Sequence, residues 1–134
     1  MSRFLIDYIT ALHEDFESYC AVKLDGCGIT QGQIAFIVYI GDHPNCSPSE
    51  LSTEVSADSG YTARSIKKLV EAGLALKQQQ EADRRAYSLR LTELGMSMFE
   101  QCNKLHEQWE QQITGGLEAA ERESLLELLR KLGM

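Results

Sequence analysis

Long apolar runs are absent from this chain of 134 residues. No stretch approaches the roughly eighteen consecutive apolar residues of a membrane-spanning helix. The N-terminal sequence MSRFLIDYITALHEDFE is acidic and amphipathic, so it lacks the basic start and continuous apolar segment of a signal peptide. Hydrophobic residues make up 43% and charged residues 25% of the chain, as in ordinary globular proteins. We therefore expect one cytoplasmic domain over residues 1–134, with no membrane partner.

Patterns typical of disulfide frameworks and metal sites are also missing. The four cysteines Cys20, Cys27, Cys46 and Cys102 include no CxxC pair, and their spacings fit neither a disulfide framework nor a four-thiolate zinc site. His43 and Cys46 could supply two metal ligands, but two further ligands are not evident, so a solvated loop is the preferred interpretation. We expect reduced thiols, no metal and no cofactor.

Catalytic signatures are absent as well. His13, His43 and His106 lie in three separate segments, and no Ser or Cys stands in a recognised nucleophile motif. The chain contains no glycine-rich phosphate loop. The sequence therefore predicts a protein that is not an enzyme.

Basic residues are outnumbered overall but are concentrated in the middle of the chain. Thirteen Lys and Arg against twenty Asp and Glu give a formal net charge of -7. The net charge is -6 over residues 1–57, +3 over residues 58–92 and -4 over residues 93–134. Phosphate binding needs clustered cations rather than a basic protein overall, so the middle segment favours a localised nucleic-acid surface. A merely solvated face, or a face for an acidic protein partner, is the alternative.

Three helices are expected where capping residues precede apolar residues at helical spacing. They begin after Thr30, Ser47 and Asp58, each of which is a favourable N-cap residue. We expect the first helix to end at Gly41 and the third at Gly73, since glycine readily adopts the left-handed conformation that ends many helices.

The second and third of these helices, joined by a tight turn, form a helix-turn-helix candidate. Small and polar residues at the start of the third helix would let its backbone approach base edges in the DNA major groove. Arg64 could make a forked contact to a base, while Lys67 and Lys68 could reach phosphates. The other residues expected to face DNA are Ser59, Gly60, Tyr61 and Thr62.

Two strand-like segments follow, at residues 74–79 and 86–91, and a polar tip joins them. Two helices followed by such a hairpin make a winged helix-turn-helix. A guanidinium at the wing tip suits the narrow minor groove, where negative potential is concentrated. We therefore expect Arg84 and Arg85 to contact DNA, with Asp83 orienting a guanidinium.

Both ends of the chain are predicted to be amphipathic helices. Residues 1–24 carry one apolar stripe, and residues 93–134 carry two apolar segments separated by Gly115 and Gly116. A DNA-reading unit over residues 30–92 leaves these ends free to build a two-fold dimer interface, although they could instead cover the core of their own chain. The expected fold class is α+β, mainly α: a winged helix-turn-helix with N- and C-terminal dimerisation helices.

The segments CSPSELS, GYTARSIKKLVEAGL and DRRAYSLRLTELG resemble the MarR family of bacterial transcriptional regulators, and the similarity covers essentially the whole chain. The resemblance implies a dimer that binds a pseudo-palindromic operator in double-stranded DNA, usually as a repressor released by a small molecule or by oxidation. The family's wing pattern falls on Asp83, Arg85, Leu91, Thr92 and Gly95. It implies that Arg85 enters the minor groove.

Two kinds of regulation stay open at this point. A small-molecule pocket could lie between the dimerisation helices and the DNA-reading unit, although the aromatic residues that would line it could equally be core. These aromatic residues are Phe16, Tyr19, Phe36 and Trp109. A thiol switch could instead use Cys20 or Cys46, and Cys46 is expected to have the better electrostatics because it lies near a helix N-terminus.

Overall fold

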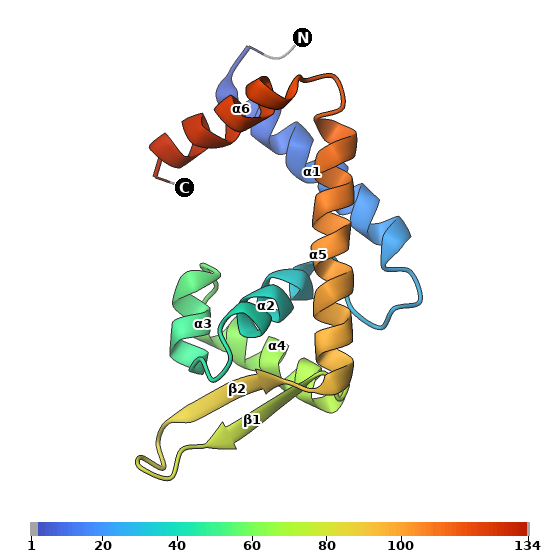
Figure 1. Ribbon diagram of the computed structural model, residues 1–134. Coiled ribbons are helices and arrows are strands. Elements are labelled where there is room, and N and C mark those ends of the chain that lie inside the picture. The colour runs from blue at the N-terminus through green and yellow to red at the C-terminus, as the bar shows by residue number, and fades with distance from the viewer. Residues whose placement is uncertain (1–2, 134) are drawn as a thin grey trace.

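The computed structural model describes residues 3–133, which form helices and one two-stranded antiparallel sheet (Figure 1). The elements in chain order are α1 (Leu5–Lys23), α2 (Gln31–Asp42), α3 (Pro48–Glu54), α4 (Ser59–Glu71), β1 (Ala75–Gln79), β2 (Tyr87–Leu91), α5 (Glu93–Ile113) and α6 (Ala119–Lys131). This arrangement confirms the expected mainly helical winged helix-turn-helix. None of the described helices is both long and apolar enough to cross a bilayer.

The predicted caps Ser47 and Asp58 begin α3 and α4. Ser47 Oγ accepts a hydrogen bond from the Glu50 N–H at 3.0 Å, and Asp58 Oδ1 accepts one from the Tyr61 N–H at 2.7 Å. Each bond satisfies a backbone donor that the first turn of a helix leaves without a partner. Gly73 has φ +75°, the left-handed conformation expected after α4.

The wing is a regular hairpin whose second strand also pairs with the segment before α3. β1 pairs with β2 along its whole length, with Ala75 opposite Leu91 at the root. Leu89 also pairs on its other side: its N–H donates to the Cys46 carbonyl, and its carbonyl accepts the Asn45 N–H, both at 2.8 Å. The segment before α3 therefore holds β2 in place.

The core is centred on the winged helix-turn-helix, with α2 packed against α5 and against the wing. Most of the largest fully buried side chains come from α2, α3, α4 and β2. They include Ile37, Ile40, Leu51, Leu69 and Leu89. Burying apolar side chains from all these elements together holds α4 and the wing in one unit.

Helix α5 starts in close contact with the root of the wing. Thr92 Oγ1 accepts the Gly95 N–H at 3.0 Å and donates to the Gly73 carbonyl at 2.6 Å. The Thr92 N–H donates to the Leu74 carbonyl at 3.0 Å. Gly95 lies so close to this same carbonyl that a Cβ atom would overlap it. The first turn of α5 is thereby locked to the end of α4 and the start of β1.

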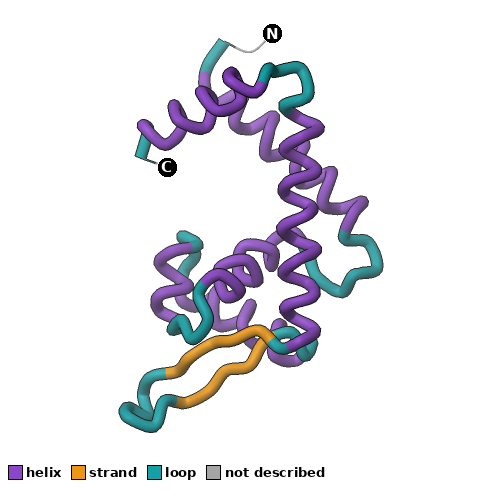
Figure 2. Tube along the Cα trace, in the orientation of Figure 1, coloured by secondary structure: helices purple, strands orange, loops and turns teal. Residues whose placement is uncertain are grey.

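Helix α6 and the start of α1 lie at the far end of α5 from the wing, and α1 runs back along α5 toward the core (Figures 1 and 2). The break between α5 and α6 falls at Gly115 and Gly116, as expected. Large apolar side chains on these helices are more than 40% exposed in the single chain. They include Phe4, Leu5, Tyr8, Leu12, Leu125, Leu128 and Leu132. So much exposed apolar surface at one end is unusual for a monomer.

We predict that Gly95→Ala lowers the free energy of unfolding by about 1–3 kcal/mol, the cost of overpacking a tight site. The added methyl group would collide with the Leu74 backbone, which cannot move without distorting the wing root. Gly116→Ala is the matched control, because no neighbouring atom lies within 4 Å of its Cβ position. Urea unfolding of both variants measures the difference; equal stability would contradict the proposed close contact.

Candidate nucleic-acid interface

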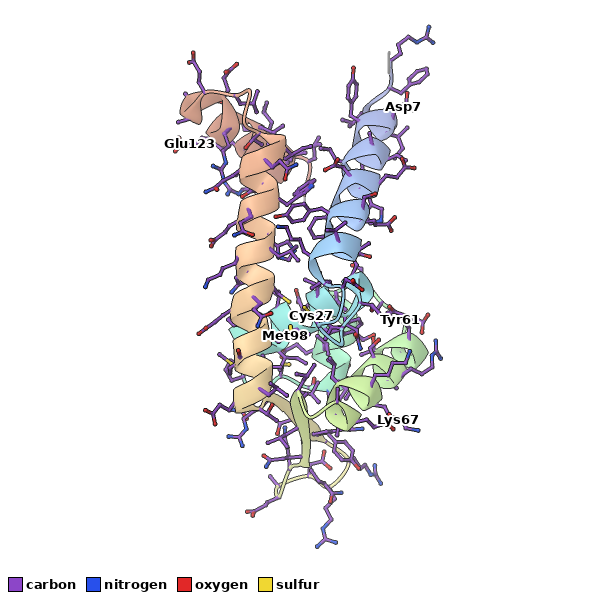
Figure 3. The ribbon with its side chains drawn as sticks, turned by 90° about the vertical axis from the view of Figure 1, so that its right-hand side faces the viewer. Asp7, Cys27, Tyr61, Lys67, Met98 and Glu123 are labelled. Carbon is purple, nitrogen blue, oxygen red and sulfur yellow. The ribbon has the colours of Figure 1, made fainter. Side chains whose placement is uncertain are left out.

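Helix α4 presents most of its predicted DNA-contacting residues to solvent. Ser59, Gly60, Arg64, Lys67 and Lys68 are all exposed. Figure 3 shows the labelled Lys67 on the outer surface of α4, at the end of the molecule that also carries the wing. The exposed positions of α4 thus combine small residues in its first turn with cations farther along.

Thr62 does not belong to this exposed set. Its side chain is only 2% exposed, and its hydroxyl donates to the Asp58 carbonyl at 2.8 Å. Thr62, Ile66 and Leu69 follow one another at spacings of four and three residues, so they share the buried face of α4. Thr62 therefore stabilises the first turn and the core, and it is not available for base contacts in this conformation.

Tyr61 joins α4 to the start of α2. Its ring packs at a tilt against Phe36, with centroids 5.8 Å apart. A Cβ atom on Gly32 would lie 2.9 Å from the Tyr61 hydroxyl, so this hydroxyl sits against the first turn of α2. Tyr61 is 42% exposed, and Figure 3 shows it on the same side of the molecule as Lys67. This position suits a side chain that orients α4 against α2 better than one that contacts DNA bases.

A cleft of about 360 Å³ lies between α4 and the start of α2. Cationic and hydroxyl side chains from α4 meet polar groups of the α2 cap there. The residues lining the cleft are Gly28, Thr30, Gln33, Tyr61, Arg64, Ser65, Lys68 and Ala72. Two cations and several hydrogen-bond donors make this cleft suitable for an anionic group.

The wing tip is a hydrogen-bonded turn that carries two exposed arginines. Asp83 Oδ1 accepts the Arg85 N–H at 3.0 Å, and the Ala86 N–H donates to the Asp83 carbonyl at 3.0 Å. The Gln79 side chain donates to the Arg84 carbonyl across the turn. Within residues 3–133, Asp83 forms no ion pair with either arginine. Asp83 therefore fixes the backbone from which the guanidinium groups project, and the expected direct contact with a guanidinium is not present.

The four aromatic candidates for an effector pocket are engaged in packing. Phe16 lies edge-on to Trp109 with centroids 5.1 Å apart, and Trp109 Nε1 donates to Asp15 Oδ2 at 2.8 Å, which joins α1 to α5. Phe36 is only 2% exposed, and Tyr19 is partly buried against the core. None of the four lines the cleft beside α4. These surroundings are those of residues that pack in the core rather than residues that line a small-molecule pocket.

The two cysteines proposed for a thiol switch are both buried. Burial raises the pKa of the Cys20 thiol. Burial, together with the nearby Glu50 carboxylate, raises the pKa of the Cys46 thiol. Both shifts oppose formation of the thiolate, so neither cysteine has the lowered pKa that a reactive thiol needs. The described residues also contain no group of three or more side chains arranged to hold a metal ion.

Comparison with known proteins identifies the family to which this chain belongs. The family model described as MarR family matches residues 29–87, which span α2 to the start of β2. The HTH-type transcriptional regulator BilQ of Clostridium symbiosum is 39% identical over 126 residues, covering 94% of this chain and 88% of that protein. The chain belongs to the MarR family. It is a transcriptional regulator and not an enzyme, in agreement with the sequence analysis.

Two further comparisons agree with this assignment. The BilQ regulator of Clostridioides difficile is 31% identical, covering 78% of this chain and 71% of that protein. The solved structure of a MarR transcriptional regulator from Methanosarcina mazei Go1 superposes with a TM-score of 0.89 at 27% identity. That match covers 98% of this chain and 94% of the other, so the similarity includes α1, α5 and α6 as well as the DNA-reading unit.

Proposed function

We propose that this MarR-family regulator binds a pseudo-palindromic operator as a cytoplasmic homodimer and represses transcription until a small-molecule effector releases it. The observation that carries the proposal is the placement of the exposed cations of α4 and the arginines of the wing tip. Helix α4, with the labelled Lys67, and the wing lie at the end of the molecule opposite α6 (Figures 1 and 3). One face can therefore contact DNA while the other end contacts a second subunit.

In this proposal the exposed side of α4 enters the major groove. Ser59 and Gly60 are small enough for the first turn to approach base edges, and Arg64 can make a bidentate contact to a guanine. Lys67 and Lys68 reach the phosphates that flank the groove. The wing adds Arg84 and Arg85 on a turn held by backbone hydrogen bonds, so little ordering is needed when Arg85 enters the minor groove.

We predict that Arg85→Ala weakens operator binding by about 1–3 kcal/mol without lowering the stability of the protein. The side chain is exposed, and the hydrogen bond from the Arg85 N–H to Asp83 survives the substitution. Lys104→Ala is the matched control, because Lys104 is an exposed cation on α5 away from the wing. Fluorescence anisotropy with an operator duplex measures both; equal affinity of the two variants would remove the wing from the interface.

We predict that Lys67→Ala weakens binding to operator and unrelated DNA alike. Each lysine that neutralises one phosphate releases about one counterion, so the slope of log K against log salt should flatten by roughly one unit. The same salt titration of Lys104→Ala should reproduce the slope of the unmodified protein. An unchanged slope for Lys67→Ala would mean that this lysine does not contact a phosphate.

Dimerisation would cover the apolar surface of α1 and α6. These helices expose several leucines and aromatic residues at one end of the chain, where a two-fold partner could bury the same set from its own side. A dimer built this way would hold two copies of α4 at the separation of successive major grooves, roughly 34–36 Å. Operator symmetry would then follow from subunit symmetry.

We predict that Leu128→Asp produces monomers at concentrations where the unmodified protein is dimeric. Leu128 is 60% exposed in the single chain, so its replacement leaves the fold of the subunit intact but places a charge in the proposed interface. Leu76→Asp on the wing, where Leu76 is 42% exposed, is the control and should remain dimeric. If sedimentation velocity shows a dimer for both variants, the interface lies elsewhere.

The cleft between α4 and α2 is our proposed effector site. An anion held there would occupy Arg64 and Lys68, which are the same cations that the operator needs.

We predict that benzoate, as a probe anion, binds the free protein and lowers its affinity for the operator. Calorimetry should show benzoate affinity about tenfold weaker for Lys68→Ala, the loss of one charge-assisted hydrogen bond. Equal benzoate affinity for the two proteins would place the effector site elsewhere.

A further inference from the structure

Helix α6 turns away from the end of α5 and has little support from its own chain (Figure 1). None of its residues is buried. Within residues 3–133, one ion pair joins it to another helix: Arg122 Nη2 donates to Glu110 Oε2 of α5 at 3.1 Å. The two side chains are 37% and 39% exposed. Burial in the core therefore does not fix the direction of α6, and the ion pair is the contact that can.

The link between the two helices, residues 114–118, permits other directions of α6. It contains Gly115 and Gly116, and no neighbouring atom lies within 4 Å of the Cβ position of Gly116. Glycine adopts more backbone conformations than any other residue. The Thr114 hydroxyl donates to the Glu110 carbonyl at 2.6 Å, which completes the end of α5 without reaching α6. The ion pair therefore restrains a link that is otherwise free to bend.

Both charges stand at helix ends that disfavour them. Glu110 lies in the last turn of α5, and Arg122 lies at the end of the first turn of α6. The helix dipole favours cations near a C-terminus and anions near an N-terminus. Exchanging the two residues would suit each helix better by itself. Local helix stability therefore does not explain their placement, whereas the ion pair across the link does.

The neighbouring residue of α5 holds the other terminal helix. Trp109 Nε1 donates to Asp15 Oδ2 of α1 at 2.8 Å, and the Trp109 ring packs edge-on against Phe16. Consecutive residues, Trp109 and Glu110, thus attach α1 and α6 to the same turn of α5. These two helices carry the exposed apolar side chains proposed to bind a second subunit. The direction of α6 therefore shapes the surface that the partner would meet.

We propose that Glu110 and Arg122 are positioning residues of the dimer, whose ion pair fixes the direction of α6 and thereby the distance between the two copies of α4. Leu125 and Leu128 follow Arg122 on α6 and are 41% and 60% exposed, so a change in the direction of α6 displaces both. A two-fold axis repeats the displacement in the partner, so the distance between the two DNA-contacting ends changes with it. The inference rests on the proposed dimer and its operator.

The first test exchanges the charges and measures the dimer dissociation constant by sedimentation. We expect Arg122→Glu to raise this constant about fivefold, the scale of one exposed ion pair. Glu110→Arg should act in the same direction, although each single change suits its own helix dipole. The double variant, with the pair reversed, should return to the constant of the unmodified protein.

Lys131→Glu is the matched control, because it makes the same change of charge at an exposed residue of α6 that forms no ion pair within residues 3–133. Its dissociation constant should equal that of the unmodified protein. The proposal is overturned if Arg122→Glu dimerises normally, if Lys131→Glu weakens the dimer as much, or if the double variant stays as weak as the single variants.

The second test measures affinity for operator duplexes whose half-sites lie at the selected spacing or one base pair closer or farther apart. The unmodified protein should prefer the selected spacing about tenfold, the scale of one mismatched base pair. Arg122→Glu should prefer it only about threefold, because a freer α6 lets the two copies of α4 follow displaced half-sites. The double variant should regain the full preference, an effect that a loss of stability alone would not produce.

The outcomes separate this inference from the proposed function. An unmodified protein that prefers one spacing, together with Arg122→Glu that prefers it equally strongly, would overturn the positioning role and leave the proposed function standing. An unmodified protein that is monomeric or indifferent to spacing would contradict the proposed function, and the positioning role would fall with it.

Discussion

The contact between the first turn of α5 and the root of the wing is the constraint on which the remaining structure depends. Thr92 and Gly95 fix this turn against the Gly73 and Leu74 carbonyls. From there α5 runs as one helix to the end of the molecule that carries α1 and α6 (Figure 2). A rigid helix anchored at one end transmits position over its length, so this contact sets the placement of the winged helix-turn-helix relative to α1 and α6.

A different kind of surface lies at each end of α5. The wing end carries a local excess of cations although the whole chain has a net charge of -7, and the other end exposes apolar side chains. In the proposed complex the cations attract DNA and the apolar surface binds a second subunit, so the two contacts do not interfere with each other. The acidic remainder of the chain weakens attraction to DNA away from the basic face.

Features determined by neighbouring residues could be predicted from the sequence. The caps at Ser47 and Asp58 and the wing hairpin depend on local spacing, and the structure contains them. The burial of Thr62 could also have been predicted, because Thr62 lies four residues before Ile66 on the apolar face of α4. Features that depend on tertiary contacts could not be predicted. They include the burial of Cys20 of α1 and Cys102 of α5 in one core and the packing of the aromatic residues between α1 and α5.

The central claim is that this chain reads a specific DNA sequence as a symmetric dimer. Selection of binding sites from a random pool of DNA duplexes, at physiological salt, tests it most directly. The account predicts enrichment of an inverted repeat whose half-sites lie about ten base pairs apart, one helical turn. Recovery of no motif, with binding that disappears as salt rises, would reduce the basic face to non-specific attraction and favour an acidic protein partner for it instead.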